Sequence, residues 1–414
     1  MEQLKNNILA GKHMRKVLIL LLGVFVSFWV TAQAIEPSAE HLTQMTREAN
    51  KLLDRTLIIG QSPLLQRESL RLIAEEFQVA LQHWPQTSNI AVEAKLARIA
   101  LLIGFAYQYK VNDTSSAAAI YDVAIQRWWM RNESDIAQHI TYMLLQYGSI
   151  IEGLQADKAL QLYDKAILQY ARVPDLGIQA SVIKFLGAKG RLLIKLGRVD
   201  EGLAAFDNVQ DRYPNPIHAT LTSAVAGSNF AKADILYSQL GRRDEATTLL
   251  NATLKRWDMR PEPDVQQTMA FVVARLANDA FEQAKPTEAF VLNEDLLQRA
   301  SKLKIYSLVL SARSRTPLLL FNQKKYNESI TACDQFISLY EKSTALNEQY
   351  FLARTMLLKG DNLFSLYLPQ EAIKTYQQMI DRFKSSAIPN ISLLLDDAEK
   401  RKQVAQGNTL RMLR

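Results

Sequence analysis

Residues 159–170 read ALQLYDKAILQY, and this stretch decides the fold. Tyr163 follows Ala159 by four residues, Ala166 follows Tyr163 by three, and Tyr170 follows Ala166 by four. Steps of four, three and four place all four side chains on one face of an α-helix. The stretch therefore predicts a helix that buries a small residue, a central aromatic residue and a closing aromatic residue.

The same frame recurs along the chain. We call its central residue the anchor, and the eight anchors are Phe77, Tyr121, Tyr163, Phe206, Leu250, Asn293, Cys333 and Tyr376. Successive anchors are 44, 42, 43, 44, 43, 40 and 43 residues apart. Seven residues after the anchor stand Trp84, Trp128, Tyr170, Tyr213, Trp257, Ala300, Tyr340 and Phe383, and four residues before it, in the last seven units, stand Ala117, Ala159, Gly202, Ala246, Ala289, Ser329 and Ala372. Such regularity is typical of a repeat protein.

Each unit also contains an earlier helix. The segments 184–197 and 230–241 are helix-length and apolar-periodic, and both lead into Leu-Gly-Arg. Gly197 and Gly241 are natural left-handed helix stops, and Pro214 directly follows a closing aromatic residue, where it ends the second helix. The predicted unit is helix, tight turn, helix, connection.

The composition agrees with long helices. The 414 residues include only 15 glycines and 12 prolines, too few for the many turns of a β-sandwich or barrel. The single cysteine, Cys333, excludes an intramolecular disulfide and a cysteine metal cluster, and its place as an anchor predicts a small buried hydrophobe. The net charge of +7 falls to +4 when the segment 1–34 is left out, and no dense Lys/Arg block appears, so no nucleic-acid partner is expected.

The segments 195–214, 239–257 and 367–383 resemble tetratricopeptide repeats, with a Leu-Gly turn, a small residue opening the second helix and an aromatic residue four later. The resemblance covers roughly residues 65 to 385 and implies an all-α, α–α superhelix (a TPR-like solenoid) of about eight helix pairs with a capping C-terminal helix. Units of about 43 residues depart from the family's usual 34; HEAT-like units are longer but lack this turn and frame. Asn293 and Ala300 fit the frame poorly, which predicts a kink or irregular packing in the sixth unit.

The termini carry different signals. Residues 14–34 combine Arg15 and Lys16 with an apolar run of 14 residues and an Ala-Gln-Ala end, which predicts a signal peptide over 1–34 and export to a bacterial periplasm or the exterior. Met14 opens this unit and is a candidate for the true start. The alternative is an uncleaved segment that anchors the chain in the inner membrane. Residues 35–64 read as a leader and N-terminal capping helix, 65–385 as the repeat array, and 386–414 as a capping helix with a basic tail, for which a membrane-surface contact is the other interpretation.

Catalytic and cofactor motifs are absent from the sequence. It contains no phosphate-binding glycine loop, no nucleophile elbow and no HExxH, and His41, His83, His139 and His218 do not pair at ligand spacing. We therefore expect no enzyme activity, no cofactor and no metal site. The repeated aromatic residues could suggest a sugar-binding surface, but their strict recurrence on a core face favours packing.

The first helices of such a stack line its inner surface, and solvent-facing positions there are mostly cationic. The resemblance implies that Lys, Arg and Asn at such positions hold a peptide's carboxylate. The expected partner is a protein or an acidic or C-terminal peptide, bound by an exported scaffold in cell-envelope assembly; the alternative is a peptidoglycan- or carbohydrate-associated protein with hydrolytic activity. The candidate peptide-binding residues are Lys184, Arg191, Lys195, Lys232, Arg275, Asn278, Arg315 and Arg354.

Overall fold

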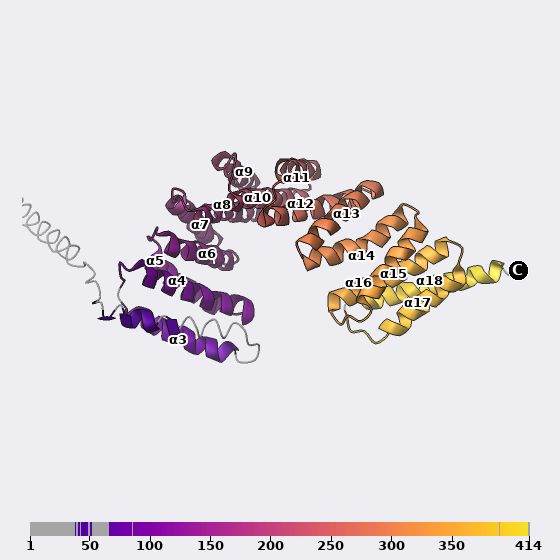
Figure 1. Cartoon of the computed structure of the whole chain (residues 1–414), viewed down its shortest axis with the longest axis horizontal. Coiled ribbons are helices and arrows are strands. Elements are labelled where there is room, and N and C mark those ends of the chain that lie inside the picture. The colour runs from indigo at the N-terminus through magenta and orange to yellow at the C-terminus, as the bar shows by residue number, and fades with distance from the viewer. Residues whose placement is uncertain are drawn as a thin grey trace, which may run out of the picture. The chain divides into compact units, whose positions relative to one another are not determined.

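The computed structural model describes residues 38, 40–41, 43–48, 50–51, 66–84, 86–388 and 390–412. The proposed signal peptide and most of the 35–64 leader lie outside these residues. No helix among the described residues is long and apolar enough to cross a membrane. The helices (Figure 1) are α3 (Gln66–His83), α4 (Ile90–Phe105), η1 (Ala106–Lys110), α5 (Thr114–Trp128), α6 (Ser134–Ile151), α7 (Ala156–Tyr170), α8 (Leu176–Lys195), α9 (Val199–Arg212), α10 (Ala219–Ser238), α11 (Arg243–Trp257), α12 (Pro263–Glu282), α13 (Pro286–Lys302), α14 (Tyr306–Asn322), α15 (Tyr326–Tyr340), α16 (Leu346–Ser365), α17 (Pro369–Phe383) and α18 (Ile391–Met412).

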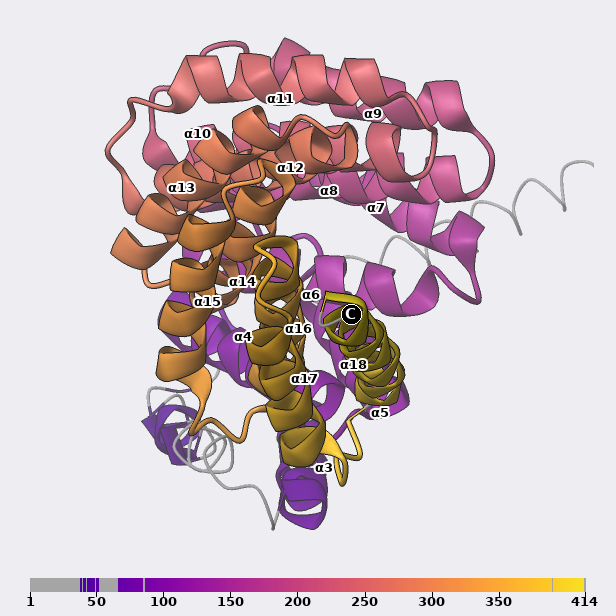
Figure 2. The same ribbon diagram turned by 90° about the vertical axis from the view of Figure 1, so that its right-hand side faces the viewer.

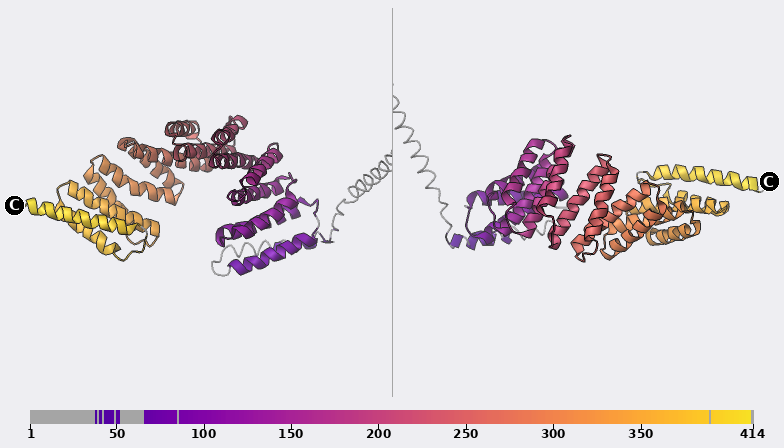
Figure 3. Two further views of the ribbon diagram at one scale, coloured as in Figure 1. Left: turned by 180° about the vertical axis from the view of Figure 1, so that it is seen from behind. Right: turned by 90° about the horizontal axis from the view of Figure 1, so that it is seen from above.

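The helices follow one another as packed pairs, which confirms the predicted all-α fold class. The even-numbered helices from α4 to α16 are the first helices of the units, and the odd-numbered helices from α3 to α17 are the second helices. Figure 2 shows α14, α15, α16 and α17 side by side, each in contact with the next. Figure 3 shows α18 (yellow) as the last helix, and it packs on α17 and α16 as the predicted C-terminal cap.

The chain divides into two compact units, Met1–Leu192 and Leu193–Arg414, with the boundary inside α8. We call them the first and the second unit and describe each by itself. The sequence analysis predicted one array over 65–385 and no such division.

All eight anchors lie in second helices and are buried. The small residues four positions before the anchor are buried in all seven repeats that carry them. Seven of the eight residues at the plus-seven position are also buried, and Tyr213 is half-buried. The frame read from residues 159–170 is therefore the core of every pair. Trp84, Trp128 and Trp257 belong to this core and are not exposed for stacking on a sugar.

Three tyrosine anchors pack against glycines of the preceding first helix. A Cβ atom added to Gly104, Gly148 or Gly360 would lie 2.1, 2.4 or 2.2 Å from a ring carbon of Tyr121, Tyr163 or Tyr376, respectively. The glycines let the two helix backbones approach closely enough for the ring to lie between them. The three tyrosine hydroxyl groups donate to Gln108 of η1 (3.3 Å), to Glu152 directly after α6 (2.6 Å) and to Asp361 of α16 (2.8 Å).

Six of the seven described turns between the helices of a pair contain a left-handed residue, and the turn between α6 and α7 contains none. Gly197 (φ 81°) and Gly241 (φ 65°) supply the left-handed residue in two of these turns, as predicted. Other pairs place Asn112, Ala284, Lys324 and Tyr367 there, each with φ between 54° and 61°. Four of these turns share a backbone bond across five residues, for example Arg198 N–H to Leu193 C=O and Lys325 N–H to Leu320 C=O. Packing of the pair thus produces a left-handed turn in four repeats that lack the glycine signal.

The sixth repeat is irregular in two ways. Its anchor Asn293 is a buried amide whose nitrogen donates to Ala312 C=O and Thr316 Oγ1, both at 3.0 Å, while its Oδ1 atom has no hydrogen-bond partner among the described residues. The following first helix, α14, contains Pro317, whose carbonyl accepts a bond from Ser329 Oγ (2.7 Å). Asn293 and Ser329 thus bond backbone groups of α14. The anchors of the other repeats are apolar or aromatic residues or Cys333.

Candidate functional site

The eight predicted peptide-binding residues all lie on first helices. We call the surface made by first helices the first-helix face of a unit. Lys184 and Arg191 are exposed residues of α8 in the first unit. In the second unit Lys195 and Arg354 are exposed, and Lys232, Arg275, Asn278 and Arg315 are half-buried.

Lys232 is held by an ion pair between helices. Its ammonium lies 2.5 Å from Asp207, the residue directly after the Phe206 anchor. Pairs with the same spacing along the chain form between Lys189 and Asp164 (2.6 Å) and between Lys359 and Asp334 (2.5 Å). Lys232 therefore belongs to a recurring link from a second helix to the next first helix.

Arg275 is also engaged, but incompletely. Its guanidinium lies 3.8 Å from the ring centroid of Tyr237 and 3.4 Å from an Asp234 oxygen. Its Nε is buried without a hydrogen-bond partner among the described residues. Burial and the hydroxyl bond to Glu282 raise the pKa of Tyr237 to about 12, so this ring stays neutral beside the cation.

Arg315 on α14 is the least compensated cation of the second unit's set. Its side chain is half-buried, and no described residue bonds its buried Nη1. Burial lowers the pKa of Arg315, and the positive charge of Arg354 on α16 lowers that pKa further. No described carboxylate forms an ion pair with either guanidinium. Two packed first helices thus each carry an arginine without an ion-paired carboxylate among the described residues, and like charges on neighbouring helices cost free energy unless an anion is supplied.

A groove of about 140 Å³ adjoins Arg354. It is lined by Ser314 and Leu318 of α14, by Phe351, Arg354, Thr355, Leu357, Leu358 and Asp361 of α16, and by Leu394 of α18. Asp361 does not compensate Arg354, because it accepts the Tyr376 hydroxyl bond and forms an ion pair with Arg401. Desolvation raises the pKa of Asp361 despite these partners. The groove offers an apolar wall and one exposed cation at its rim.

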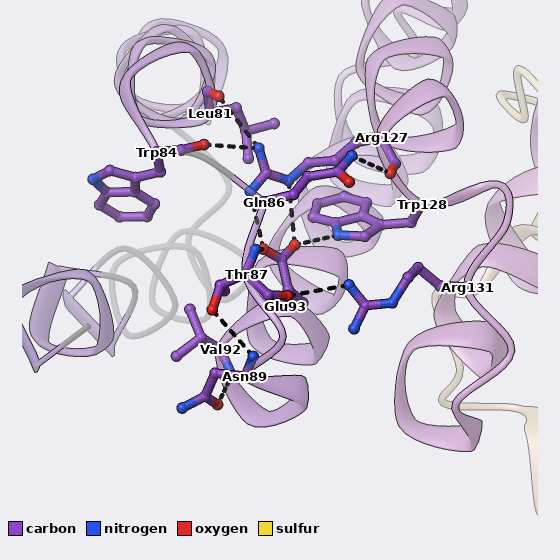
Figure 4. A network of polar contacts seen from close by, with 10 residues as sticks. All are labelled: Leu81, Trp84, Gln86, Thr87, Asn89, Val92, Glu93, Arg127, Trp128 and Arg131. Carbon is purple, nitrogen blue, oxygen red and sulfur yellow. Dashed lines mark hydrogen bonds and ion pairs between the residues drawn. The ribbon is translucent and has the colours of Figure 1, made fainter. Parts of the chain in front are cut away.

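The most buried carboxylate of the described residues, Glu93, has a structural role that the sequence analysis missed. Figure 4 shows it on α4, where it accepts bonds from Arg127 (3.0 and 3.2 Å), the Trp128 indole (2.5 Å) and Thr87 N–H (2.9 Å). Arg127 also bonds the carbonyl of Trp84, so the network ties α5 to the connection between α3 and α4.

The repeat frame explains the place of Glu93. Glu93 follows the anchor of the preceding helix by 16 residues, and Gln179, Gln266 and Gln349 stand at the same position in other repeats. Each of these glutamines donates to carbonyls of the connection before its own helix. A polar residue at the same position in several repeats is the sequence signal from which the network could have been predicted. Both Glu93 oxygens accept bonds from protein groups, so its role is to hold the loop in place.

Other reactive groups are committed to the core. Cys333 is buried, and burial raises its thiol pKa to about 12, as expected for a packing residue. No group of three or more His, Cys, Asp or Glu side chains suited to a metal ion occurs among the described residues.

Comparison with known proteins places the family signal in the middle of the chain. A tetratricopeptide repeat model matches residues 189–216, which span the end of α8 and all of α9. The chain thus carries a tetratricopeptide repeat. Its all-α architecture of consecutive helix pairs is TPR-like throughout the described helices. No curated protein sequence matches the chain.

Several solved structures are similar over most of the chain. The apo form of RapI is 12% identical, with 89% of this chain and 99% of that chain covered and a TM-score of 0.49. A Rap protein complexed with competence and sporulation factor is 13% identical, covering 89% and 100%, with a TM-score of 0.39. A tetratricopeptide repeat protein from Parabacteroides merdae ATCC 43184 is 13% identical, covering 73% and 98%, with a TM-score of 0.35.

Proposed function

We propose that this protein is an exported interaction scaffold that binds an acidic peptide segment on the first-helix face of the second unit. The observation that carries the proposal is the pair Arg315 and Arg354, which lie on the packed first helices α14 and α16 without an ion-paired carboxylate among the described residues. Such a pair favours binding of an anion, because an anion relieves the like-charge repulsion between the two guanidinium groups.

The surroundings of the pair favour a peptide over a small inorganic anion. Leu318, Phe351 and Leu358 line the adjoining groove and offer an apolar wall for a side chain next to the carboxylate. Asn278, on α12, can bond a peptide backbone through its amide. Arg275 contributes positive charge but keeps its contacts with Tyr237 and Asp234. Lys232 is assigned to the ion pair with Asp207 and is left out of the proposed site.

A hydrogen bond to a charged group contributes about 1.5–3 kcal/mol, which corresponds to roughly a 10- to 150-fold change in affinity. The test is the fluorescence anisotropy of a labelled ten-residue Glu/Ser peptide ending in Glu-Leu on addition of the full chain. Arg315→Gln and Arg354→Gln should each weaken binding at least tenfold. Arg212→Gln is the matched control, because Arg212 is an exposed arginine of a second helix, bonded to Asn208 (2.6 Å).

The same peptide with an amidated C-terminus separates two forms of the proposal. A large loss of affinity on amidation assigns the pair to a terminal carboxylate, and no loss assigns it to acidic side chains. Equal affinities of the wild type and both arginine variants would exclude this surface as the binding site.

Export is a separate part of the proposal and rests on the sequence of residues 14–34. Determination of the N-terminus of the protein isolated from its native envelope tests it. A mature chain that begins after Ala34 supports a periplasmic or secreted scaffold. A chain that retains the segment and sediments with membranes supports the inner-membrane-anchored alternative.

A further inference from the structure

The first unit carries an exposed aromatic surface that the repeat frame does not explain. Tyr109 of η1 exposes 59% of its surface and Tyr142 of α6 exposes 42%. The Phe105 ring stacks on Tyr109 at a centroid distance of 5.4 Å and an interplanar angle of 28°. These three residues lie on the first-helix face, outside the anchor positions. Exposed aromatic residues that gather on one surface indicate a binding site.

A π-helical turn places Tyr109 on this surface. The residues Ala106–Lys110 form η1, in which the N–H of Val111 bonds the carbonyl of Ala106, five residues back. A π-turn accommodates one extra residue, and such turns are rare and concentrate at functional sites. Its effect here is to bring the Tyr109 hydroxyl to Gln146 of α6 at 2.7 Å.

The two tyrosines are held in place without being covered. The bond to Gln146 and the stack on Phe105 orient Tyr109, and the ammonium of Lys184 on α8 lies 5.1 Å from the centroid of the Tyr142 ring. Rings fixed before binding lose little conformational entropy when a ligand arrives. Because Gln146 Oε1 accepts the tyrosine hydroxyl, its amide nitrogen remains as a donor, and Lys184 adds a second donor group.

We propose that this surface, formed by Phe105, Tyr109, Tyr142, Gln146 and Lys184, binds an extended proline-containing peptide segment. Proline has no N–H, so a proline-rich strand presents carbonyl acceptors and few donors, which matches the donors beside the rings. Aromatic-lined surfaces are the usual receptors of such strands.

The spacing of the helices fits the same ligand. A polyproline II strand rises about 3.1 Å per residue with three residues per turn, so one face repeats every ~9 Å. Packed helices lie about 8–10 Å apart, and α4 packs directly on α6. In the proposed complex the strand crosses η1 and α6, with one proline ring on Tyr109 and the next of the same face on Tyr142. This site is independent of the arginine pair proposed for the second unit.

Decaproline labelled with a fluorophore is the probe, because it holds the polyproline II conformation by itself. We expect saturable anisotropy changes with the full chain, and no binding of a labelled Gly/Ser decapeptide. Tyr109→Ala and Tyr142→Ala should each weaken decaproline binding at least tenfold. Tyr109→Phe keeps the stack but loses the Gln146 bond, and should weaken binding less than Tyr109→Ala does.

Tyr306→Ala is the matched control, because Tyr306 is 55% exposed and its hydroxyl bonds Glu348 of the next first helix in the second unit. It should leave decaproline affinity unchanged, while circular dichroism verifies that every variant is folded. Absence of binding at millimolar decaproline overturns the proposal. So does an equal loss in the Tyr306 variant, or binding of chitohexaose that depends on Tyr109 and Tyr142 when decaproline binding does not.

Discussion

Gly360→Ala tests the view that each pair is built around an anchor ring packed on the preceding helix. A Cβ atom at residue 360 would lie 2.2, 2.6 and 2.7 Å from three ring carbons of Tyr376, well inside van der Waals contact. The ring must therefore shift, although it is 1% exposed and its hydroxyl bonds Asp361 at 2.8 Å. The substitution should destabilise the second unit.

The magnitude follows from three contributions. Overpacking a core costs about 1–3 kcal/mol. Loss of the bond to the buried Asp361 carboxylate costs roughly another 1–3 kcal/mol. Alanine in place of glycine inside a helix returns about 1 kcal/mol. The expected net loss is therefore about 1–5 kcal/mol.

Gly227→Ala is the matched control in the same unit. Gly227 lies inside α10, and a Cβ atom there would meet nothing within 4 Å, so only the helix-propensity gain of up to about 1 kcal/mol remains. The two glycine substitutions should therefore change stability in opposite directions.

Hydrogen exchange measured by mass spectrometry is the suitable assay, because a repeat protein of this length is not expected to unfold in one step. Peptides from α16 and α17 should exchange faster in Gly360→Ala, and peptides from α10 should exchange no faster in Gly227→Ala. Protection of α16 and α17 equal to that of the wild type would refute the close-packing argument, as would a Gly227→Ala variant that loses as much stability as Gly360→Ala.

Three further predictions follow from the same structure. Glu93→Gln removes the carboxylate charge that pairs with the guanidinium of Arg127, which is 10% exposed, and should destabilise the first unit by about 3–5 kcal/mol. Hydrogen exchange of peptides from α4 and α5 measures the loss, and a loss under ~1 kcal/mol would contradict the buried network. Lys324→Gly relieves a left-handed backbone (φ 61°) and should raise the melting temperature, since the penalty of about 1–2 kcal/mol exceeds glycine's entropic cost of about 0.5–1 kcal/mol; an unchanged or lower value counts against strain. Burial, and then the charge of Arg98, lower the pKa of His139 in the folded protein. The stability that neutral His139 contributes is therefore complete above the unfolded pKa of about 6.5, and it is lost as the pH falls from there through the lower folded pKa. Between pH 7.5 and 5, the stability of His139→Gln should decline less steeply than that of the wild type. Parallel curves for the two proteins would contradict a lowered pKa of His139.

Much of the fold could be predicted from the sequence, because a buried helix face repeats in residue type as well as in space. Tyr163 and Tyr376 could be assigned to the core from their spacing to small residues, and both are buried. Cys333 could be assigned in the same way, although its chemistry alone would also allow a reactive thiol. The candidate site was less predictable, because solvent-facing residues need not follow the period of the core.

Sequence position identified the first-helix cations as a group, but it could not show which of them have a counter-ion in the folded protein. Lys232 and Arg315 look equivalent in sequence, yet one reaches Asp207 and the other has a buried nitrogen without a partner among the described residues. The difference depends on which side chains of neighbouring helices lie within a few ångströms. The π-turn that exposes Tyr109 was likewise invisible, because one extra residue in a helix leaves no compositional mark.

The sequence by itself determined the class of fold, the order of helices and the residues of the core, since these depend on a local period of 3.6 residues repeated about every 43. Tertiary structure alone decided how closely Tyr376 approaches Gly360, which left-handed turns use residues other than glycine, and which charges find partners. The physical reason is range. Helix periodicity is a property of neighbours along the chain, whereas close packing and charge compensation depend on atoms that are brought together only when successive helices pack.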